Sequence, residues 1–347
     1  MRRTLVALAI ALSQAAGAST LDIYFIDVEG GQATLIVTPA GESLLVDAGF
    51  PGDGTFASKA GDPRQARDAQ RVAAAARAAG VTRVDYLLVT HFHADHAGGV
   101  PELAQLLPIG TFIDHDTVPA VAETNVAGTL AMFEAYAAVR AKGTHLVPKP
   151  GDRLPLKGVD AIVVSTSGSA LTQPLRGAGA NTAGCAPTSP PAQEANENPR
   201  STGFRLDFGA FRFLDLGDLS GAPLFALACP ASLVGPVDVY LVAHHGGLDA
   251  ADAATFAAFA PRVAVVNNGA NKGGAPEIFR ALRQAAGVDA WQLHRSQIEG
   301  SQNFADERIA NLDETTTHWI KVSAKEDGSF TVTNGRTGAA KAYAARR

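Results

Sequence analysis

The chain contains very little cysteine, with only Cys185 and Cys229 among its 347 residues. Neither residue belongs to a Cys-x-x-Cys pattern, which argues against a zinc ribbon and a dithiol redox motif. In an exported protein, an even pair of cysteines favours one disulfide over two free thiols. If the chain is exported, we therefore expect a single Cys185–Cys229 bridge.

Long apolar runs are also absent. The apolar run 5–12 is too short to span a bilayer, and no other stretch is long and apolar enough to do so. Arg2 and Arg3 precede this run and the small residues Ala16-Gly17-Ala18 follow it, which is the order of a secretion signal and its cleavage site. We therefore expect a signal peptide at 1–18 and a mature, periplasmic or extracellular chain without a membrane span. A buried N-terminal helix is the alternative.

Basic residues are outnumbered, with 29 Lys and Arg against 34 Asp and Glu, so the net charge is −5. Removal of the signal would take away two basic residues and make the charge more negative by two. An acidic protein is poorly suited to hold long nucleic acid by bulk electrostatics. We therefore expect a small-molecule or phosphoester substrate as the partner, and the sequence leaves the oligomeric state open.

Strand and helix patterns run through the whole mature chain, and 46% of all residues are hydrophobic, which is ample for a sizeable core. Strands are expected at 21–26, 33–37, 43–46, 84–89, 111–114, 204–208, 211–214, 237–242, 263–266, 290–293, 317–322 and 329–333. Helices are expected at 65–79, 99–107, 124–141, 251–259 and 276–285. No linker divides this pattern, so residues 19–347 are predicted to form one domain of two packed sheets with helices outside.

One long segment, 165–203, breaks the rhythm. It is rich in Gly, Ala, Pro, Ser and Asn and has no apolar period. Loops of this length in a compact domain are usually functional or disordered. A lid over the functional site and a plain surface insertion are both open interpretations.

The most informative stretch is His91-Phe92-His93-Ala94-Asp95-His96, directly after the expected strand 84–89. Three imidazoles and a carboxylate within six residues suit a first-row divalent ion, most often zinc. His91 and His93 are two residues apart, so both side chains can point to the same side of an extended loop. Asp95 and His96 can then serve a second ion beside the first.

Further ligands follow two later strands. Phe213-Leu214-Asp215-Leu216-Gly217-Asp218 ends in a carboxylate after a glycine, and the strand at 237–242 is followed by His244-His245-Gly246-Gly247. Functional groups gather at strand ends because the sheet holds them rigidly while the loops vary. Asp218 and one of the paired histidines are therefore candidates to complete a metal centre.

In these motifs and their order, the chain resembles the metallo-β-lactamase superfamily of metal hydrolases. The resemblance covers nearly all of the mature chain. It implies an α/β fold, an αββα sandwich of two mixed sheets with helices outside, and a two-metal site at one edge between the sheets. The implied cofactors are two divalent ions, Zn²⁺ in the first place with Mn²⁺ as the alternative.

The resemblance also implies roles for individual residues. The implied metal ligands are His91 and His93 for the first ion, Asp95, His96 and His244 for the second, and Asp218 as the bridge between them. Asp47 is implied to be structural, bonding to the loop that shapes the motif. We expect His244 rather than His245 to be the ligand because it comes first after the strand. Asp95, His115 and His245 are the candidate catalytic residues.

One element of the family pattern is missing, because no histidine lies between His145 and Asp218. The third histidine of the first metal site should fall there, and the chain instead has Asn196-Glu197-Asn198-Pro199-Arg200-Ser201. This segment and the turn Asp27-Val28-Glu29-Gly30-Gly31-Gln32 resemble the branch that contains the soluble domains of bacterial DNA-uptake (competence) channel proteins and related phosphodiesterases. Water, Asn198 or His115 could then take the vacant place.

Other polar residues are weaker candidates. In Asn267-Asn268-Gly269-Ala270-Asn271-Lys272-Gly273-Gly274, backbone amides and Lys272 could hold an anion before the next helix, or the run could be a plain turn. The candidate substrate contacts are Asn198, Asn268, Lys272 and His294, and His115 could be a substrate contact, a ligand or structural. His145 and His318 are expected to be structural.

Together these features predict an exported metal-dependent hydrolase, phosphodiesterase-like, in which a hydroxide bridging two divalent metals attacks the substrate. A lactonase or β-lactamase type of C–O or C–N hydrolase is the alternative, and the missing histidine counts against the lactamase. A metal-binding protein without turnover is a third interpretation. The sequence does not name the substrate, because one fold hosts many reactions.

Overall fold

The computed structural model describes residues 20–54, 63–116, 123, 125–185, 195–249 and 253–346. The expected signal peptide at 1–18 lies outside these residues, and so does the 186–194 part of the long loop. Within the described residues, no helix is long and apolar enough to cross a membrane.

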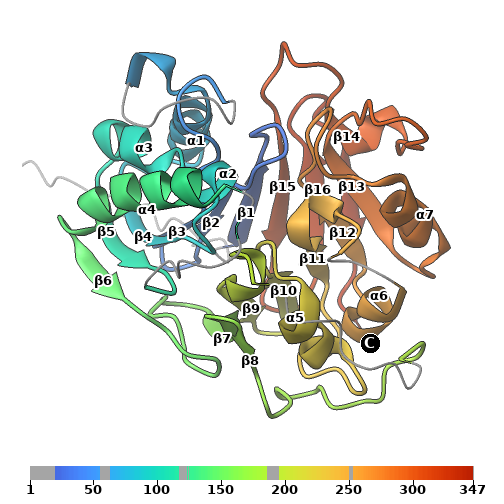
Figure 1. Cartoon of the computed structure of the whole chain (residues 1–347). Helices are drawn as coiled ribbons and strands as arrows, with labels where there is room; N and C mark the ends of the chain where they lie inside the picture. The colour runs from blue at the N-terminus through green and yellow to red at the C-terminus, as the bar shows by residue number, and fades with distance from the viewer. Residues whose placement is uncertain are drawn as a thin grey trace, which may run out of the picture.

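Two mixed sheets form the centre of the molecule (Figure 1). Sheet A has nine strands in the order β17-β16-β15-β1-β2-β3-β4-β5-β6, and sheet B has eight in the order β14-β13-β12-β11-β10-β9-β7-β8. The strands of sheet A are β1 Leu21–Ile26, β2 Thr34–Val37, β3 Ser43–Val46, β4 Val84–Leu88, β5 Ile109–Ile113, β6 Thr144–Leu146, β15 Trp319–Ala324, β16 Phe330–Asn334 and β17 Ala340–Tyr343. The strands of sheet B are β7 Asp160–Thr166, β8 Ser169–Ala170, β9 Gly203–Phe208, β10 Phe211–Asp215, β11 Val239–Leu241, β12 Val263–Val266, β13 Asp289–His294 and β14 Ile309–Asn311.

Helices cover the outer face of each sheet, α1, α3 and α4 on one side and α5, α6 and α7 on the other (Figure 1). Their bounds are α1 Arg67–Ala78, α2 Ala94–Ala97, α3 Val100–Leu106, α4 Val126–Arg140, α5 Gly221–Ala228, α6 Ala253–Phe259 and α7 Pro276–Gln284. Short 3-10 turns lie at Pro63–Gln65, Asn198–Arg200, Ala243–Gly246 and Asp306–Arg308. The αββα sandwich expected from the sequence is therefore confirmed.

Alternation along each strand produces the layers, because successive side chains point to opposite faces of a sheet. In β4, Leu88 joins the core between the sheets, whereas Leu87 packs with the helices outside sheet A. In β10, Phe213 lies between the sheets and Leu214 packs with the helices outside sheet B. Three buried apolar layers thus hold the sandwich together, and burial of each apolar side chain stabilises it by roughly 1.5–3 kcal/mol.

Strands from both sheets end at one edge of the sandwich. β3, β4 and β5 are parallel neighbours in sheet A, and β10, β11 and β12 are parallel neighbours in sheet B. Segments that follow the C-terminal ends of such strands meet at the same edge, which is where ligands bind in open α/β sheets. The six-residue motif, Asp218 and the paired histidines His244 and His245 all come from these segments.

The sequence patterns missed some elements. No strand was expected at β7, and the helix α5, Gly-Ala-Pro-Leu-Phe-Ala-Leu-Ala, begins with glycine, contains proline and lacks an amphipathic pattern. The segment 165–203 is also less irregular than expected, because it begins inside β7 and includes β8 and a 3-10 turn. Packing in the sandwich, rather than local sequence preference, decides these elements.

The disulfide Cys185–Cys229 is confirmed, and it joins the segment after β8 to the end of α5. Two backbone hydrogen bonds support this attachment, from Leu175 N to Leu233 O and from Thr182 N to Pro230 O. The part of the loop before Cys185 is thus fixed to the body of the protein. The lid interpretation stays a prediction, since residues 186–194 lie outside the described structure.

We expect the double variant Cys185→Ser/Cys229→Ser to lose about 2–4 kcal/mol of unfolding free energy, because the bridge restricts the unfolded chain over a separation of 44 residues. Urea unfolding followed by circular dichroism measures this loss. A reductant should lower the wild-type stability to that of the variant and leave the variant unchanged. A wild-type protein with two titratable thiols and unaltered stability would contradict the prediction.

Candidate metal centre

The carboxylate of Asp47, just after β3, shapes the histidine motif. Its Oδ1 accepts a hydrogen bond from Thr90 N at 2.8 Å, and its Oδ2 accepts one from Thr90 Oγ1 at 2.7 Å. The same Oδ2 lies 2.7 Å from His96 Nδ1. Asp47 is fully buried and has a positive φ of 59°. The expected structural role of Asp47 therefore agrees with its contacts.

Two residues of the motif form a buried group with two residues from sheet B. The group consists of Asp95, His96, Asp218 and His245. Each offers one ligand atom, and these atoms all lie within 4.8 Å of one another. Asp218 Oδ2 is 3.2 Å from the Nε2 atoms of both His96 and His245, and Asp95 Oδ2 is also 3.2 Å from each. We call these four residues the buried cluster.

The buried cluster fits a divalent ion by its chemistry. Two imidazoles and two carboxylates are a donor set that Zn²⁺ and Mn²⁺ accept. Asp218 Oδ1 is buried and accepts no hydrogen bond from any described residue. Since an unpaired buried carboxylate oxygen is costly, this atom is suited to a cation beside the cluster.

Charges within the cluster compensate one another. Burial alone would raise the pKa of both carboxylates. For Asp95, the charges of Lys272 and His96 outweigh burial and hold its pKa well below the usual range. For Asp218, the charges of His245 and His96 have the same effect. Burial would lower the pKa of His96, but Asp218 and Asp95 raise it well above its ordinary value. Ion binding at His96 must therefore displace a proton, which makes the affinity depend on pH.

The paired histidines are placed differently from the expectation. His245 is almost fully buried and belongs to the cluster, whereas the side chain of His244 is 26% exposed. His244 Nδ1 lies 2.7 Å from Asp249 Oδ1, and its Nε2 is 3.6 Å from Asp218 Oδ2. The geometry therefore favours His245 rather than His244 as the ligand.

The backbone explains this reversal. The preference for His244 assumed that the strand continues to the histidines. β11 instead ends at Leu241, and both histidines have positive φ, 50° for His244 and 54° for His245, inside a 3-10 turn. The alternation of a strand does not apply in such a turn, so the residue nearer the strand is not the one that faces the cluster.

His91 and His93 form the other half of the centre. His91 Nε2 is 2.9 Å from His93 Nδ1 and 3.9 Å from Asp218 Oδ2. Burial and the neighbouring His96 lower the pKa of His91 well below its ordinary value, which keeps its imidazole neutral and able to donate a lone pair. Asp218 thus lies near His91 as well as in the buried cluster.

The segment that stands in for the missing histidine lies beside His91. Ser201 Oγ is 3.5 Å from His91 Nδ1 and accepts a hydrogen bond from Asp218 N. Thr202 N donates to Thr90 O at 2.8 Å, which fixes the segment to the motif. Asn198 is buried and its Oδ1 has no hydrogen-bond partner among the described residues. A role of Asn198 at the first half stays a prediction.

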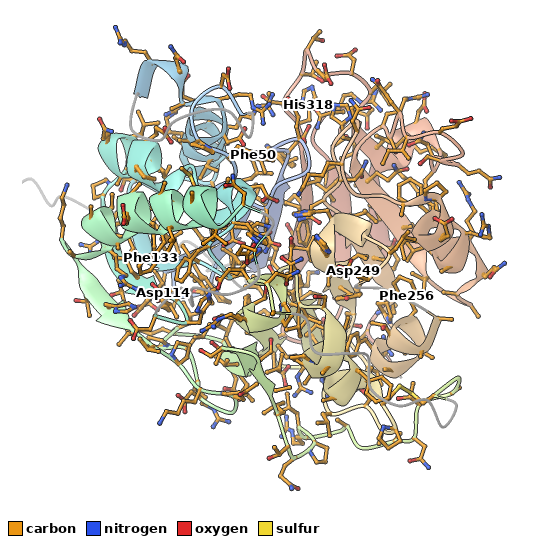
Figure 2. The ribbon with its side chains drawn as sticks, viewed as in Figure 1. Phe50, Asp114, Phe133, Asp249, Phe256 and His318 are labelled. Carbon is orange, nitrogen blue, oxygen red and sulfur yellow. A yellow bond between two sulfur atoms is a disulfide. The ribbon has the colours of Figure 1, made fainter. Side chains whose placement is uncertain are left out.

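Three other histidines lie outside the centre. His115 Nε2 is 2.9 Å from the buried Glu197 Oε2, so the structure supports its structural interpretation over a catalytic or ligand role. His145 Nε2 is paired with Asp114 Oδ1 at 2.9 Å, as a structural residue would be. His318 lies near the upper edge of Figure 2, far from Asp249 at the centre.

Two of the expected substrate contacts are fully buried and partly bonded to the backbone. His294 Nδ1 lies 2.9 Å from Arg295 O. Asn268 Nδ2 donates to Gly269 O and to His294 O. His294 Nε2 and Asn268 Oδ1 have no hydrogen-bond partner among the described residues, so a substrate role for these two side chains stays a prediction.

Lys272, in contrast, reaches the centre. Its Nζ donates to Asp95 Oδ2 and to Gly30 O, both at 2.5 Å, and its side chain is 29% exposed. The loops 27–32 and 267–274 are in close contact here. A Cβ atom on Gly30 would lie only 2.9 Å from Lys272 Cβ and 3.1 Å from Gly269 N, so a larger residue would not fit without a shift. A cation therefore lies at the accessible side of the buried cluster.

Sequence reasoning missed three acidic partners of the histidines. Asp249 is bonded to His244, Glu197 to His115, and Glu123 Oε2 lies 3.1 Å from His93 Nε2. Glu197 and His115 are 82 residues apart and Glu123 and His93 are 30 apart, so only the fold brings these two pairs together. Asp249, in contrast, is only five residues after His244.

Comparison with known proteins gives one family match and several similar structures. The model of the metallo-β-lactamase superfamily matches residues 26–178, which contain the histidine motif but neither Asp218 nor His245. No curated protein matches the chain. Among solved structures, the metallo-β-lactamase fold protein YhfI from Bacillus subtilis is 12% identical, with a TM-score of 0.44, over 78% of this chain and 96% of that chain.

Two further solved structures are similar. A new diphosphatase from the PhnP family is 11% identical with a TM-score of 0.40, over 78% of this chain and 94% of that chain. MEM-A1, a subclass B3 metallo-β-lactamase from a soil metagenome library, is 14% identical with a TM-score of 0.37, over 67% of this chain and 80% of that chain. With TM-scores below 0.5, none of these similarities carries a functional argument.

The chain has the metallo-β-lactamase fold, and residues 26–178 match the model of that superfamily. The family match and the buried cluster together support a metal-dependent hydrolase. The narrower resemblance to the DNA-uptake branch stays a prediction, as do the number and identity of the ions.

We expect His245→Ala to lose one tightly bound zinc ion per chain, because it removes a ligand and leaves two carboxylates facing each other. His244→Ala should keep that ion, since its imidazole lies outside the cluster. Zinc content after dialysis against a weak chelator, measured by plasma mass spectrometry, compares the two variants. Loss of zinc in His244→Ala with full retention in His245→Ala would reverse our assignment.

Proposed function

We propose that this protein is an exported hydrolase that cleaves phosphodiesters, with the ligands His91, His93, Asp95, His96, Asp218 and His245 holding two divalent ions. The observation that carries the proposal is the ammonium group of Lys272, which lies against Asp95 at the accessible side of the buried cluster. A cation in this place favours a substrate with a negative charge next to the reacting bond. A phosphodiester carries that charge on the reacting phosphoryl group itself, whereas a lactone carries none.

The substitution of the third histidine supports the same preference. Ser201 lies beside His91, where the resemblance would place an imidazole in a full first site. A β-lactam also carries a negative charge, but the resemblance associates lactamase activity with the full histidine set. The phosphodiester is therefore the substrate class that suits both the cation and the incomplete first half.

Bound divalent ions would supply hydroxide from water near neutral pH and stabilise charge on the attacked phosphoryl group. Lys272 Nζ can bind a non-bridging phosphoryl oxygen and orient the substrate. His244 Nε2 lies at the edge of the cluster while its Nδ1 is held by Asp249. As the water oxygen bonds to phosphorus and the bond to the leaving oxygen breaks, His244 can give a proton to that leaving oxygen.

Export is part of this proposal and rests on the charged start, short apolar run and small residues of 1–18. The disulfide supports it, because such bridges persist in oxidising compartments.

The proposed activity is tested with chromogenic phosphodiester, lactone and β-lactam reporters on the mature, zinc- or manganese-loaded protein. We expect hydrolysis of the phosphodiester, with a kcat/KM at least tenfold above that for the other two reporters. Asp218→Ala should abolish it, since this carboxylate lies between both halves of the centre. Turnover of the lactam alone would refute the proposal, and binding of ions without any turnover would favour a metal-binding protein.

For Lys272→Met we expect KM for the phosphodiester to rise about tenfold, because a charge-assisted hydrogen bond contributes roughly 1.5–3 kcal/mol. The rate on a neutral lactone, where measurable, should not change. Lys142→Met is the matched control, since Lys142 is exposed just after α4. Zinc content is measured in parallel. An unchanged KM with a normal zinc content would remove the anion-binding role of Lys272.

A further inference from the structure

The imidazole of His93 is held from both sides. Its Nδ1 faces His91 Nε2 at 2.9 Å, on the side where the first ion is expected. Its Nε2 points away from the centre and lies 3.1 Å from Glu123 Oε2. A neutral imidazole has a proton on one nitrogen and a free lone pair on the other. A carboxylate can only accept, so this contact puts the proton on Nε2 and leaves Nδ1 free for an ion.

The second oxygen of Glu123 serves a different segment. Glu123 Oε1 accepts a hydrogen bond from Glu197 N at 2.6 Å. Glu197 begins the turn that stands where the third histidine is missing. Glu197 Oε2 in turn accepts from Phe92 N at 3.3 Å and pairs with His115 Nε2 at 2.9 Å. One carboxylate therefore joins His93 directly to the segment that replaces a ligand.

We infer that Glu123 is the positioning residue of the first half of the centre. It fixes the tautomer and the orientation of His93, and it holds the replacement segment next to His91. This inference rests on the proposed metal centre. The first half needs such support because it lacks the third imidazole of the family pattern. The side chain of His93 is also 24% exposed, whereas that of His96 is fully buried.

A purely local role for Glu123 does not explain its contacts. The N-terminus of α4 is capped by Asn125, whose Oδ1 accepts from Gly128 N. Glu123 is not needed for that cap, and only 7% of its side chain is exposed. Its two oxygens are both used by groups of the centre, His93 on one side and the 195–202 segment on the other.

The test compares Glu123→Ala and Glu123→Gln with wild type in two measurements. Long-range ¹H–¹⁵N correlation spectra of the metal-free protein report the tautomer of each histidine. Zinc competition titrations report Kd for the weaker and the tighter site. Glu134→Ala is the matched control, because Glu134 is an exposed carboxylate on α4.

For Glu123→Ala we expect His93 to lose its preference for the Nε2–H tautomer and Kd of the weaker site to rise about 10- to 100-fold, with the tighter site unchanged. Glu123→Gln should restore most of both properties, since its amide oxygen still accepts a hydrogen bond. Glu134→Ala should match wild type throughout.

Two results would overturn the inference. One is an unchanged His93 tautomer and unchanged zinc affinities in Glu123→Ala. The other is an equal weakening of both sites with a lower melting temperature in Glu123→Ala and Glu123→Gln, which would mark Glu123 as merely structural. Neither readout requires turnover, so an inactive protein would refute the proposed hydrolase without affecting this result.

Discussion

The contact of the Asp47 carboxylate with Thr90 and His96 is the interaction on which the rest of the centre depends. It joins the end of β3 to the loop after β4, and so it links two neighbouring strands of sheet A at their C-terminal edge. A fully buried carboxylate is costly unless its oxygens are bonded. Folding of the sandwich therefore favours the conformation of the motif loop that supplies those bonds, and this conformation brings the histidines together.

The sandwich provides what this contact requires. Sheet A carries Asp47 and the six-residue motif, and sheet B carries Asp218 and His245, so the buried cluster forms only when the two sheets pack together. The apolar layer between the sheets thus stabilises the site as well as the fold. The carboxylates and imidazoles of the buried cluster compensate one another's charge, and this lowers the cost of burying four ionisable groups.

The sequence predicted the architecture well because strand alternation and turn glycines are local signals, and it predicted the motif because its ligands lie within six residues. It failed where geometry is decided by the backbone or by distant partners. The choice between His244 and His245 depends on a turn with two positive φ angles, which no periodicity reveals. Glu123 and Glu197 gain their roles from contacts across the fold, and α5 has no local helical signal.

The two halves of the centre differ in the contacts that hold their histidines. The half with His96 and His245 is buried, is held by Asp47, and shares both carboxylates of the cluster. The half with His91 and His93 relies on hydrogen bonds to residues outside the motif, and it borders the segment that replaces a histidine. Since affinity follows ligand number and rigidity, the first half should bind its ion more weakly than the second. If His91 and His93 hold an ion, their smaller ligand set would leave room for a substrate oxygen. We therefore expect substrate choice to depend on this half, while the other half maintains the structure of the centre.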